Sequence, residues 1–167
     1  MIELNKEDIV NLQGHNSRGN QPKFRKDGIW YKADFFGYEG LTEHVVSNLL
    51  RHSNIENFVE YWEEELLYDN RTRNGCASKD FLPHEGQLIT ITRLFESQFG
   101  KNPEEYMNSK DSKERIERAI HGIKIATRLK ETEIGEYLTS LIELDAVILN
   151  DDRHFNNIAV LYHNDEY

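Results

Sequence analysis

The most informative stretch of this 167-residue sequence is a polar loop: Asn150-Asp151-Asp152-Arg153-His154-Phe155-Asn156-Asn157-Ile158-Ala159. Apolar residues at helical spacing precede the loop over 133–149, and an apolar run follows it over 158–162. These patterns predict a helix, a loop and a short strand in that order. Because buried elements would fix both ends of such a loop, its polar side chains should be rigidly positioned.

Two further helices are predicted from apolar spacing, one over residues 112–130 and one over residues 42–50. Thr42 is a candidate cap for the second of these. Asp27-Gly28 is a strong two-residue turn signal, so residues 23–36 should form a hairpin with Lys32 on its second strand. The remaining predicted strands cover 58–68, where a helix fits equally well, then 76–82 and 87–94, with a polar turn over 69–75.

The order of these elements predicts an α+β fold with two lobes. A strand-rich lobe over residues 1–95 would precede a helical lobe over 96–167, with a seam near residues 82–100. A chain of 167 residues is long enough to bury a hydrophobic core.

The charge and cysteine content narrow the class of protein. With 20 Lys and Arg against 30 Asp and Glu, the net charge of −10 disfavours non-specific binding to nucleic-acid backbones. The single Cys76 cannot form an internal disulfide, and no apolar run reaches the roughly 18 residues that span a bilayer. We therefore expect a cytoplasmic protein without a membrane partner. A nucleic-acid interface would depend only on the cluster of Arg18, Lys23, Arg25 and Lys26.

An acid and an amide in the loop have a spacing typical of phosphoryl transfer. In that chemistry an Asp accepts or orients the attacking hydroxyl, and an Asn five positions later binds magnesium. Asp152 and Asn157 have this spacing, and so do Asp151 and Asn156. The same residue types also cap helices and form turns, so a purely structural role of the loop stays open.

A lysine and a glutamate further upstream fit the same chemistry. Lys32 on a strand and Glu43 in the first turn of a helix would hold nucleotide phosphates, with the amine supplying positive charge and the carboxylate fixing its position. The alternative is a solvent-facing strand lysine and a glutamate that complements the helix dipole.

The polar segment 14–23 is a third candidate element. Gly14 and Gly19 would let backbone N–H groups approach phosphate oxygens. The segment fits no Walker consensus, and an ordinary surface loop would have the same composition.

Taken in order along the chain, these features resemble the HipA-like serine/threonine kinases. Asp152-Arg153-His154-x-x-Asn157 resembles the catalytic loop of that family, and Thr42-Glu43-His44-Val45-Val46 resembles its glutamate helix. Asn20-Gln21-Pro22-Lys23-Phe24 is similar to the polar segment before its lysine strand, and Lys79-Asp80-Phe81 to the strand before its interlobe hinge. The resemblance extends from Gly14 to Tyr162, and the catalytic-loop motif is its most specific part.

The resemblance implies a two-lobed, protein-kinase-like fold and a reaction in which ATP with Mg²⁺ transfers its γ-phosphate to a protein Ser or Thr. Arg153 and His154 would brace the catalytic loop, and His154 is also a candidate for the chemistry. The other implied roles are catalytic base for Asp152, magnesium ligand for Asn157, phosphate-binding lysine for Lys32 with Glu43 as its partner, autophosphorylation site for Ser17, phosphate-loop glycine for Gly19 and nucleotide contact for Lys79.

The sequence departs from the family's pattern after the catalytic loop. Residues 158–162 would be the first strand of a hairpin with His163-Asn164-Asp165 as its turn, and the family's second magnesium-binding Asp would follow on the returning strand. We therefore expect a truncated helical lobe with an unpaired strand edge. The alternative function is a catalytically inactive kinase homologue that binds a protein. The expected partners are a protein substrate, an antitoxin protein or a complementing C-terminal segment.

Overall fold

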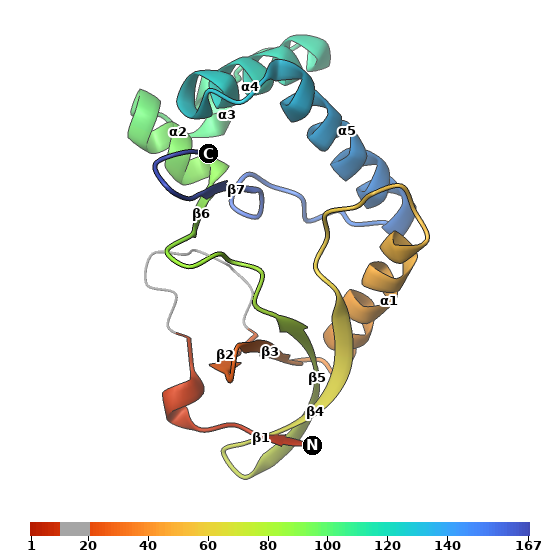
Figure 1. Ribbon diagram of the computed structural model, residues 1–167. Helices are drawn as coiled ribbons and strands as arrows, with labels where there is room; N and C mark the ends of the chain where they lie inside the picture. Colours follow the sequence, from red (N-terminus) through yellow and green to blue (C-terminus); the bar gives the residue numbers. More distant parts are fainter. Residues whose placement is uncertain (11–20) are drawn as a thin grey trace. The chain divides into compact units, whose positions relative to one another are not determined.

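The computed structural model describes residues 1–10 and 21–167 of the chain (Figure 1). The chain is a mixed α+β protein, as its sequence predicts, and it forms two compact units: unit 1 over residues 1–81 and unit 2 over residues 82–167. The boundary lies at residues 81–82 rather than at residue 95. The reason is that Gln87–Thr90 pairs with Ala159–Tyr162 and so belongs to unit 2.

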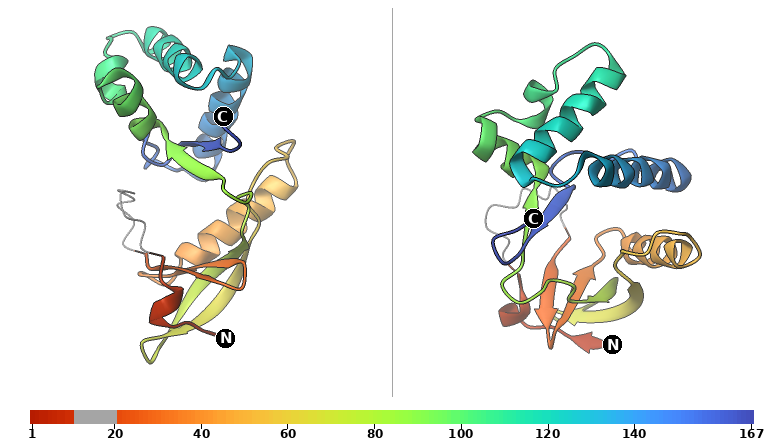
Figure 2. Two further views of the ribbon diagram at one scale, coloured as in Figure 1. Left: turned by 60° about the vertical axis from the view of Figure 1, so that its left-hand side comes forward. Right: turned by 45° about the horizontal axis from the view of Figure 1, so that its top comes forward.

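Unit 1 is built around a curled five-stranded sheet. Its elements are β1 Ile2–Glu3, a 3-10 helix Lys6–Asp8, β2 Lys23–Lys26, β3 Ile29–Ala33, α1 Glu39–Arg51, β4 Tyr61–Tyr68 and β5 Arg71–Lys79. The strands lie in the order β1-β4-β5-β3-β2, with β1 parallel to β4 and the other pairs antiparallel. Helix α1 lies along β4 and β5 (Figure 2).

Two tight turns set the register of this sheet. The predicted hairpin is confirmed: Asp27 and Gly28 connect β2 to β3, with φ of 52° and 75° that suit a two-residue turn. Asp69 and Asn70 connect β4 to β5 in the same way, with φ of 52° and 57°. The prediction of a longer turn over 69–75 is wrong, because residues 71–75 pair with β4. The ambiguous segment 58–68 is a strand from Tyr61 onward, since it pairs with β5.

The two faces of the sheet have different partners. One face carries the apolar core of unit 1, and the other, which includes Lys32, receives α1. A Cβ atom on Gly40 of α1 would collide with the backbone of Gly75, so only glycine permits this approach. Asp34 Oδ1 accepts a hydrogen bond from Gly40 N at 2.7 Å and holds the start of the helix. The buried core residues are Leu4, Phe24, Tyr31, Ala33, Leu66 and Ala77.

Helix α1 begins at Glu39, ahead of the predicted cap. Thr42 lies inside the helix and its Oγ1 donates to Tyr38 O at 3.0 Å, so the prediction that Thr42 caps the helix is wrong. The carboxylate of Glu39 organises the preceding turn instead, because it accepts hydrogen bonds from Phe36 N and Gly37 N at 3.0 and 3.1 Å. Glu43 consequently lies in the second turn of the helix.

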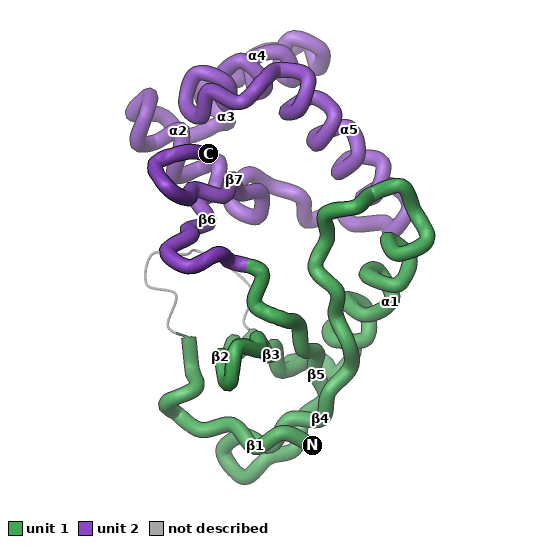
Figure 3. The backbone as a smooth tube through the Cα atoms, viewed as in Figure 1, with its two compact units in different colours: residues 1–81 green, residues 82–167 purple. Residues whose placement is uncertain are grey.

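Unit 2, which is described throughout, combines a two-stranded sheet with four helices (purple in Figure 3). The predicted helices over 112–130 and 133–149 are confirmed, with slightly different bounds. Buried apolar side chains of the helices and of the loop before the last strand form one core: Ile91, Leu94, Phe95, Ile123, Ile134 and Ile158. The elements are β6 Gln87–Thr90, α2 Ile91–Phe99, α3 Pro103–Tyr106, α4 Ser112–Thr127, α5 Glu131–Ile148 and β7 Ala159–Tyr162.

The segment 87–94 is not the continuous strand that its apolar residues predict. Thr90 Oγ1 accepts a hydrogen bond from Arg93 N at 3.3 Å, so Thr90 caps helix α2 and ends β6. Helix α2 then buries Ile91, Leu94 and Phe95. A short apolar run fits a strand and a buried helix equally well, which explains the error.

The strand β7 leads into a tight turn at the predicted position. His163 and Glu166 exchange two backbone hydrogen bonds, of 2.8 and 3.1 Å, around Asn164 and Asp165. These two residues have φ of 53° and 64°, as a two-residue turn requires. One edge of β7 pairs with β6, so the expectation of an unpaired edge applies to its other edge alone.

Candidate functional site

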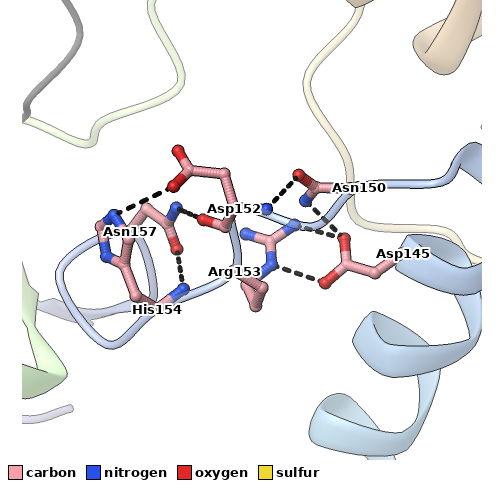
Figure 4. A network of polar contacts seen from close by, with 6 residues as sticks. All are labelled: Asp145, Asn150, Asp152, Arg153, His154 and Asn157. Atoms are coloured by element: carbon pink, nitrogen blue, oxygen red, sulfur yellow. Dashed lines mark hydrogen bonds and ion pairs between the residues drawn. The ribbon is translucent and has the colours of Figure 1, made fainter.

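The loop between α5 and β7 is anchored by a buried carboxylate of the helix (Figure 4). Asp145 Oδ2 accepts from Arg153 Nε at 2.7 Å, and Asp145 Oδ1 accepts from Arg153 Nη2 and Asn150 Nδ2, each at 2.8 Å. Two parallel bonds between a guanidinium and a carboxylate make a geometrically specific ion pair. The hydrogen bonds from Arg153 hold the pKa of the Asp145 carboxyl below its usual range. Asp145 is not evident as a site residue from the sequence, because an acid within a helical pattern carries no motif of its own.

Asparagine side chains fix the backbone of Asp152 on both sides. Asn157 Nδ2 donates to Asp152 O at 2.8 Å, and Asn157 Oδ1 accepts from His154 N at 3.2 Å. From the other side, Asn150 Oδ1 accepts from Asp152 N at 3.3 Å. The loop therefore forms the turns expected of its residue types, and these turns also position Asp152.

The carboxylate of Asp152 faces solvent, with 86% of its side chain exposed. His154 Nε2 lies 3.9 Å from Asp152 Oδ1, and this contact is an ion pair only when the imidazole is protonated. His154 Nδ1 accepts a hydrogen bond from Asn156 N at 3.2 Å, so the neutral ring carries its proton on Nε2, the nitrogen nearer Asp152. The separation of 3.9 Å is longer than a hydrogen bond, so the Asp152 carboxylate stays open to solvent.

The two acid-amide pairs of the loop differ in how they are joined. The Asn157 side chain donates a hydrogen bond to the backbone carbonyl of Asp152. In the described part of the chain no side-chain hydrogen bond joins Asp151 to Asn156. The Asn157 side chain therefore holds the backbone of Asp152, and the structure describes no equivalent bond between the other two residues.

The oxygens of this loop suit a hard cation such as magnesium. Carboxylate and amide oxygens are the ligands that Mg²⁺ prefers, and magnesium sites commonly use one or two protein carboxylates together with substrate phosphates and water. Asn157 Oδ1 accepts one hydrogen bond, and a carbonyl oxygen has a second lone pair for a metal. Among the described residues there is no group of three or more His, Cys, Asp or Glu that would hold a metal ion by itself.

Lys32 of β3 and Glu43 of α1 form an ion pair in unit 1. Lys32 Nζ donates to the Glu43 carboxylate and to Tyr61 Oη at 3.0 Å, and it lies 4.5 Å from the centroid of the Tyr61 ring. Burial disfavours the charged ammonium, but Glu43 and Tyr61 outweigh it and hold the pKa of Lys32 above its usual range. The alternative of a solvent-facing lysine is wrong, since the Lys32 side chain is 23% exposed. Tyr61 is not evident from the sequence, because no motif surrounds it.

Hydrogen bonds to β4 hold α1 in the position that brings Glu43 to Lys32. His44 Nδ1 donates to Tyr61 O at 2.8 Å, and its Nε2 accepts from Asn48 Nδ2 at 3.0 Å. Ser47 Oγ accepts from Tyr61 N at 3.2 Å. His44 is therefore a positioning residue for the ion pair of Lys32 and Glu43.

Cys76 lies beside this ion pair but is not a nucleophile. It is directly opposite Lys32 in the sheet register and is fully buried. Burial raises the pKa of the Cys76 thiol to about 12, so the thiol stays neutral and unreactive in the folded chain.

The sequence predicts that three further residues contact the nucleotide: Ser17, Gly19 and Lys79. Ser17 and Gly19 lie outside the described residues. Lys79 is exposed and three positions along β5 from Cys76, so strand alternation places it on the opposite face of the sheet from Lys32.

Two members of the cluster considered for nucleic-acid binding have partners within unit 1. Arg25 forms an ion pair with Asp80, and Lys26 Nζ donates to Glu3 O at 2.7 Å. Both side chains therefore make contacts within unit 1 that would compete with a nucleic-acid backbone.

Comparisons with known proteins assign no family to this chain: no protein-family model matches, and no curated protein or solved structure shows a significant match. In the part of the chain that the structure describes, no helix has the length and apolarity to cross a membrane.

Proposed function

We propose that this chain is a HipA-like serine/threonine kinase that binds ATP with Mg²⁺ and transfers the γ-phosphate to a protein. The observation that carries the proposal is the half-buried ion pair between Lys32 and Glu43, which joins a sheet strand to a helix in the order that kinases use. In this reading unit 1 is the nucleotide-binding lobe, and the loop over 150–157 is the catalytic loop of a kinase-like helical lobe.

Each polar group has a defined task in the proposed reaction. The Lys32 ammonium binds phosphate oxygens, and Glu43 keeps it in position. Asp152 orients the hydroxyl of the substrate and takes its proton as the oxygen bonds to the γ-phosphorus and the bond to the β-phosphate oxygen breaks, which leaves ADP. Asn157 would hold Mg²⁺, which supplies positive charge to the phosphates when bound.

The network around Asp145 supports this assignment because it makes the loop rigid. A catalytic base must be held within a fraction of an ångström of its working position. The ion pair of Asp145 with Arg153 and the bonds of Asn150 and Asn157 to the Asp152 backbone supply that rigidity, while the Asp152 carboxylate stays exposed. Because Asp152 acts as the base and Asn157 is the one residue assigned to magnesium, we expect slow turnover.

A transfer assay tests this function. The full chain is incubated with Mg²⁺ and ATP labelled at the γ-phosphate, and label on Ser or Thr is measured on the chain itself and on added proteins. Asp152→Asn should abolish transfer, whereas Asp151→Asn, which makes the same change at the neighbouring exposed acid, should retain it. Equal transfer by wild type and Asp152→Asn would contradict the assignment of the base.

A specific observation also favours a second function, a protein-binding kinase homologue without activity. Residues of an antiparallel pair alternate between hydrogen-bonded and non-hydrogen-bonded positions. Ile91 N donates to Ile158 O at 2.9 Å, so Ile158 is at a hydrogen-bonded position. The backbone groups of Ala159 and Leu161 therefore face the outer edge of β7. Within the described residues β7 pairs only with β6, and an apolar groove lined by Tyr137 and Leu138 of α5 adjoins β7. Such an edge can accept a strand of a partner, including an antitoxin protein.

Amide hydrogen exchange separates the two functions. A partner strand would slow exchange at Ala159 and Leu161, whereas ATP with Mg²⁺ would leave those amides unchanged. If a bound partner slowed exchange elsewhere and left these amides unchanged, the second function would be rejected.

A further inference from the structure

Helix α5 presents two stripes of residues, and the core of unit 2 uses only one of them. Ile134 is buried in that core, and Leu138 and Leu141 pack against it. The second stripe runs beside the first along the helix and is exposed to solvent. We call this second stripe the α5 seam, and it consists of Thr139, Ile142, Ala146 and Leu149.

The α5 seam has the period of a coiled coil. Its members follow one another at intervals of three, four and three residues, which is the alternation of the a and d positions of a heptad. With Ile142 at a d position, Ala146 is the next a position and Leu149 the next d position. Ile142 is 57% exposed and Leu149 is 85% exposed. A seam with this period buries its apolar side chains when a second helix packs along it.

The α5 seam can be covered without leaving a polar group unpaired. Thr139 Oγ1 donates to Gly135 O at 2.8 Å, so its hydroxyl already has a partner within the helix. Ile142, Ala146 and Leu149 have no polar side-chain atoms. Burying an unpaired polar group costs free energy, whereas burying apolar area gains it. The seam therefore favours contact with another apolar surface.

Two glutamates flank the α5 seam on one side. With Ile142 at a d position, Glu136 and Glu143 both occupy e positions, where charged side chains of paired helices meet. Both are exposed, and neither has a cationic partner in the described part of the chain. The other acids of α5 each pair with a cation: Glu131, Glu133 and Asp145.

A second copy of α5 would not supply the missing cations, because residues 131–152 contain no Lys or Arg. In an antiparallel pair the e positions of the two helices face each other, so glutamate would face glutamate. In a parallel pair they would face g positions, which hold Leu138 and Asp145, and Asp145 is already bonded to Arg153. Like charges across a helix pair oppose association, so the charges favour a different, basic helix.

We infer that the α5 seam binds an amphipathic helix of a partner protein, with apolar residues at its a and d positions and Lys or Arg beside them. The apolar residues would cover Ile142 and Leu149, and the cations would pair with Glu136 and Glu143. The net charge of −10 would attract such a helix as well. This surface belongs to unit 2 alone, and no residue of the seam lines the groove beside β7.

Fluorescence anisotropy with a labelled synthetic peptide tests the seam on the full chain. The probe has about three heptads, with Leu at a and d and Lys at e and g, and its lysines oppose pairing with itself. A scrambled peptide of the same composition controls for general attraction to an acidic protein. The same peptide with Glu in place of Lys controls for the sign of the charge. We expect saturable binding of the probe, and binding weaker by about tenfold or more for each control peptide.

Two apolar substitutions locate the site on α5. Ile142→Ala should weaken binding of the probe by about tenfold, because it removes apolar groups that the probe would cover. The matched control is Val147→Ala, which shortens an apolar residue that is 69% exposed and lies outside the seam. It should leave the affinity unchanged. Since both residues are exposed, both variants should melt at the temperature of the wild type.

A charge reversal tests the flanking acids with a second variant. Glu136→Lys combined with Glu143→Lys should weaken binding of the probe by about tenfold and make the Glu-containing peptide the preferred ligand. The matched control combines Glu56→Lys with Glu104→Lys, which changes the net charge equally at exposed positions outside α5. It should keep the preference for the Lys-containing probe.

Three results would overturn the inference. The first is equal binding of the probe and the scrambled peptide, and the second is an equal loss of affinity in Ile142→Ala and Val147→Ala or in the two charge reversals. The third is a dimer of the chain alone, seen by sedimentation, that Ile142→Ala abolishes, because a second copy would then occupy the seam. Absence of ATP binding would reject the proposed function and leave this inference intact, since the probe and its controls involve no nucleotide.

Discussion

Replacing Asp145 with asparagine removes the one buried carboxylate that anchors the loop over 150–157. The substitution keeps the size of the side chain, but it leaves the guanidinium of Arg153 without a charged partner and weakens the bond to Asn150. The chain should remain folded, and the loop should loosen.

The geometry gives the size of the effect. Breaking a buried ion pair from one side costs about 3–5 kcal/mol, because a charge is left unpaired. Here the side chain of Asp145 is 10% exposed and that of Arg153 is 29% exposed, so water can reach the guanidinium. We therefore expect Asp145→Asn to lower the free energy of unfolding of unit 2 by about 2–3 kcal/mol.

Urea unfolding followed by circular dichroism measures this change, and amide hydrogen exchange shows whether it is concentrated at residues 150–157. The matched control is Glu143→Gln, which makes the same chemical change at an exposed position of α5. In an Asp145→Asn background, a second change of Arg153→Gln should cost little, since the pair is already broken. If Asp145→Asn destabilises the chain no more than Glu143→Gln does, the ion pair does not anchor the loop.

Three other experiments have defined outcomes. Gly40→Ala should destabilise unit 1 by about 1–3 kcal/mol, measured by urea unfolding, because its Cβ would collide with the backbone of Gly75; a neutral result would mean that α1 does not approach β5 closely. Cys76 should resist thiol reagents until the chain unfolds, and rapid labelling of the native chain would contradict its burial. The pKa of Cys76 is raised from 9.0 to about 12 on folding, so its stabilising contribution is complete below pH 9 and is lost as the pH rises toward 12. The urea midpoint of the wild type should therefore fall more steeply above pH 9 than that of Cys76→Ala, and parallel curves would refute this.

The sequence contains enough local information to predict the hairpin and the ion pair of unit 1. Asp27 and Gly28 tolerate the positive φ of the turn, and that turn fixes Lys32 on the second strand. The apolar spacing predicts the helix that carries Glu43, but Leu41, Val45 and Leu49 of that pattern are exposed. The buried residues of the helix are Gly40, Ser47 and Leu50. Both predictions depend on patterns within a few residues.

The remaining features depend on contacts that no local pattern carries. The sequence around Thr90 fits a strand, and its role as the cap of α2 is evident only from the structure. The apolar residues after Thr90 fit a strand and a helix equally well. Asp145 looks like one polar position of an amphipathic helix, and only the return of the chain brings Arg153 to it. Tyr61 contacts Lys32 through sheet packing, at a separation of 29 residues. Tertiary structure therefore determines the cap at Thr90 and the contacts of Asp145 and Tyr61.

The central claim is that Lys32 binds nucleotide phosphates. The most direct measurement is calorimetric titration of the full chain with ATP and Mg²⁺, for the wild type and for Lys32→Met, with Lys26→Met as the control for loss of a lysine from the same sheet. We predict saturable binding at millimolar or lower concentrations for the wild type and the control, and about tenfold weaker binding for Lys32→Met. The absence of binding to the wild type at millimolar ATP, or equal affinity for wild type and Lys32→Met, would contradict the claim.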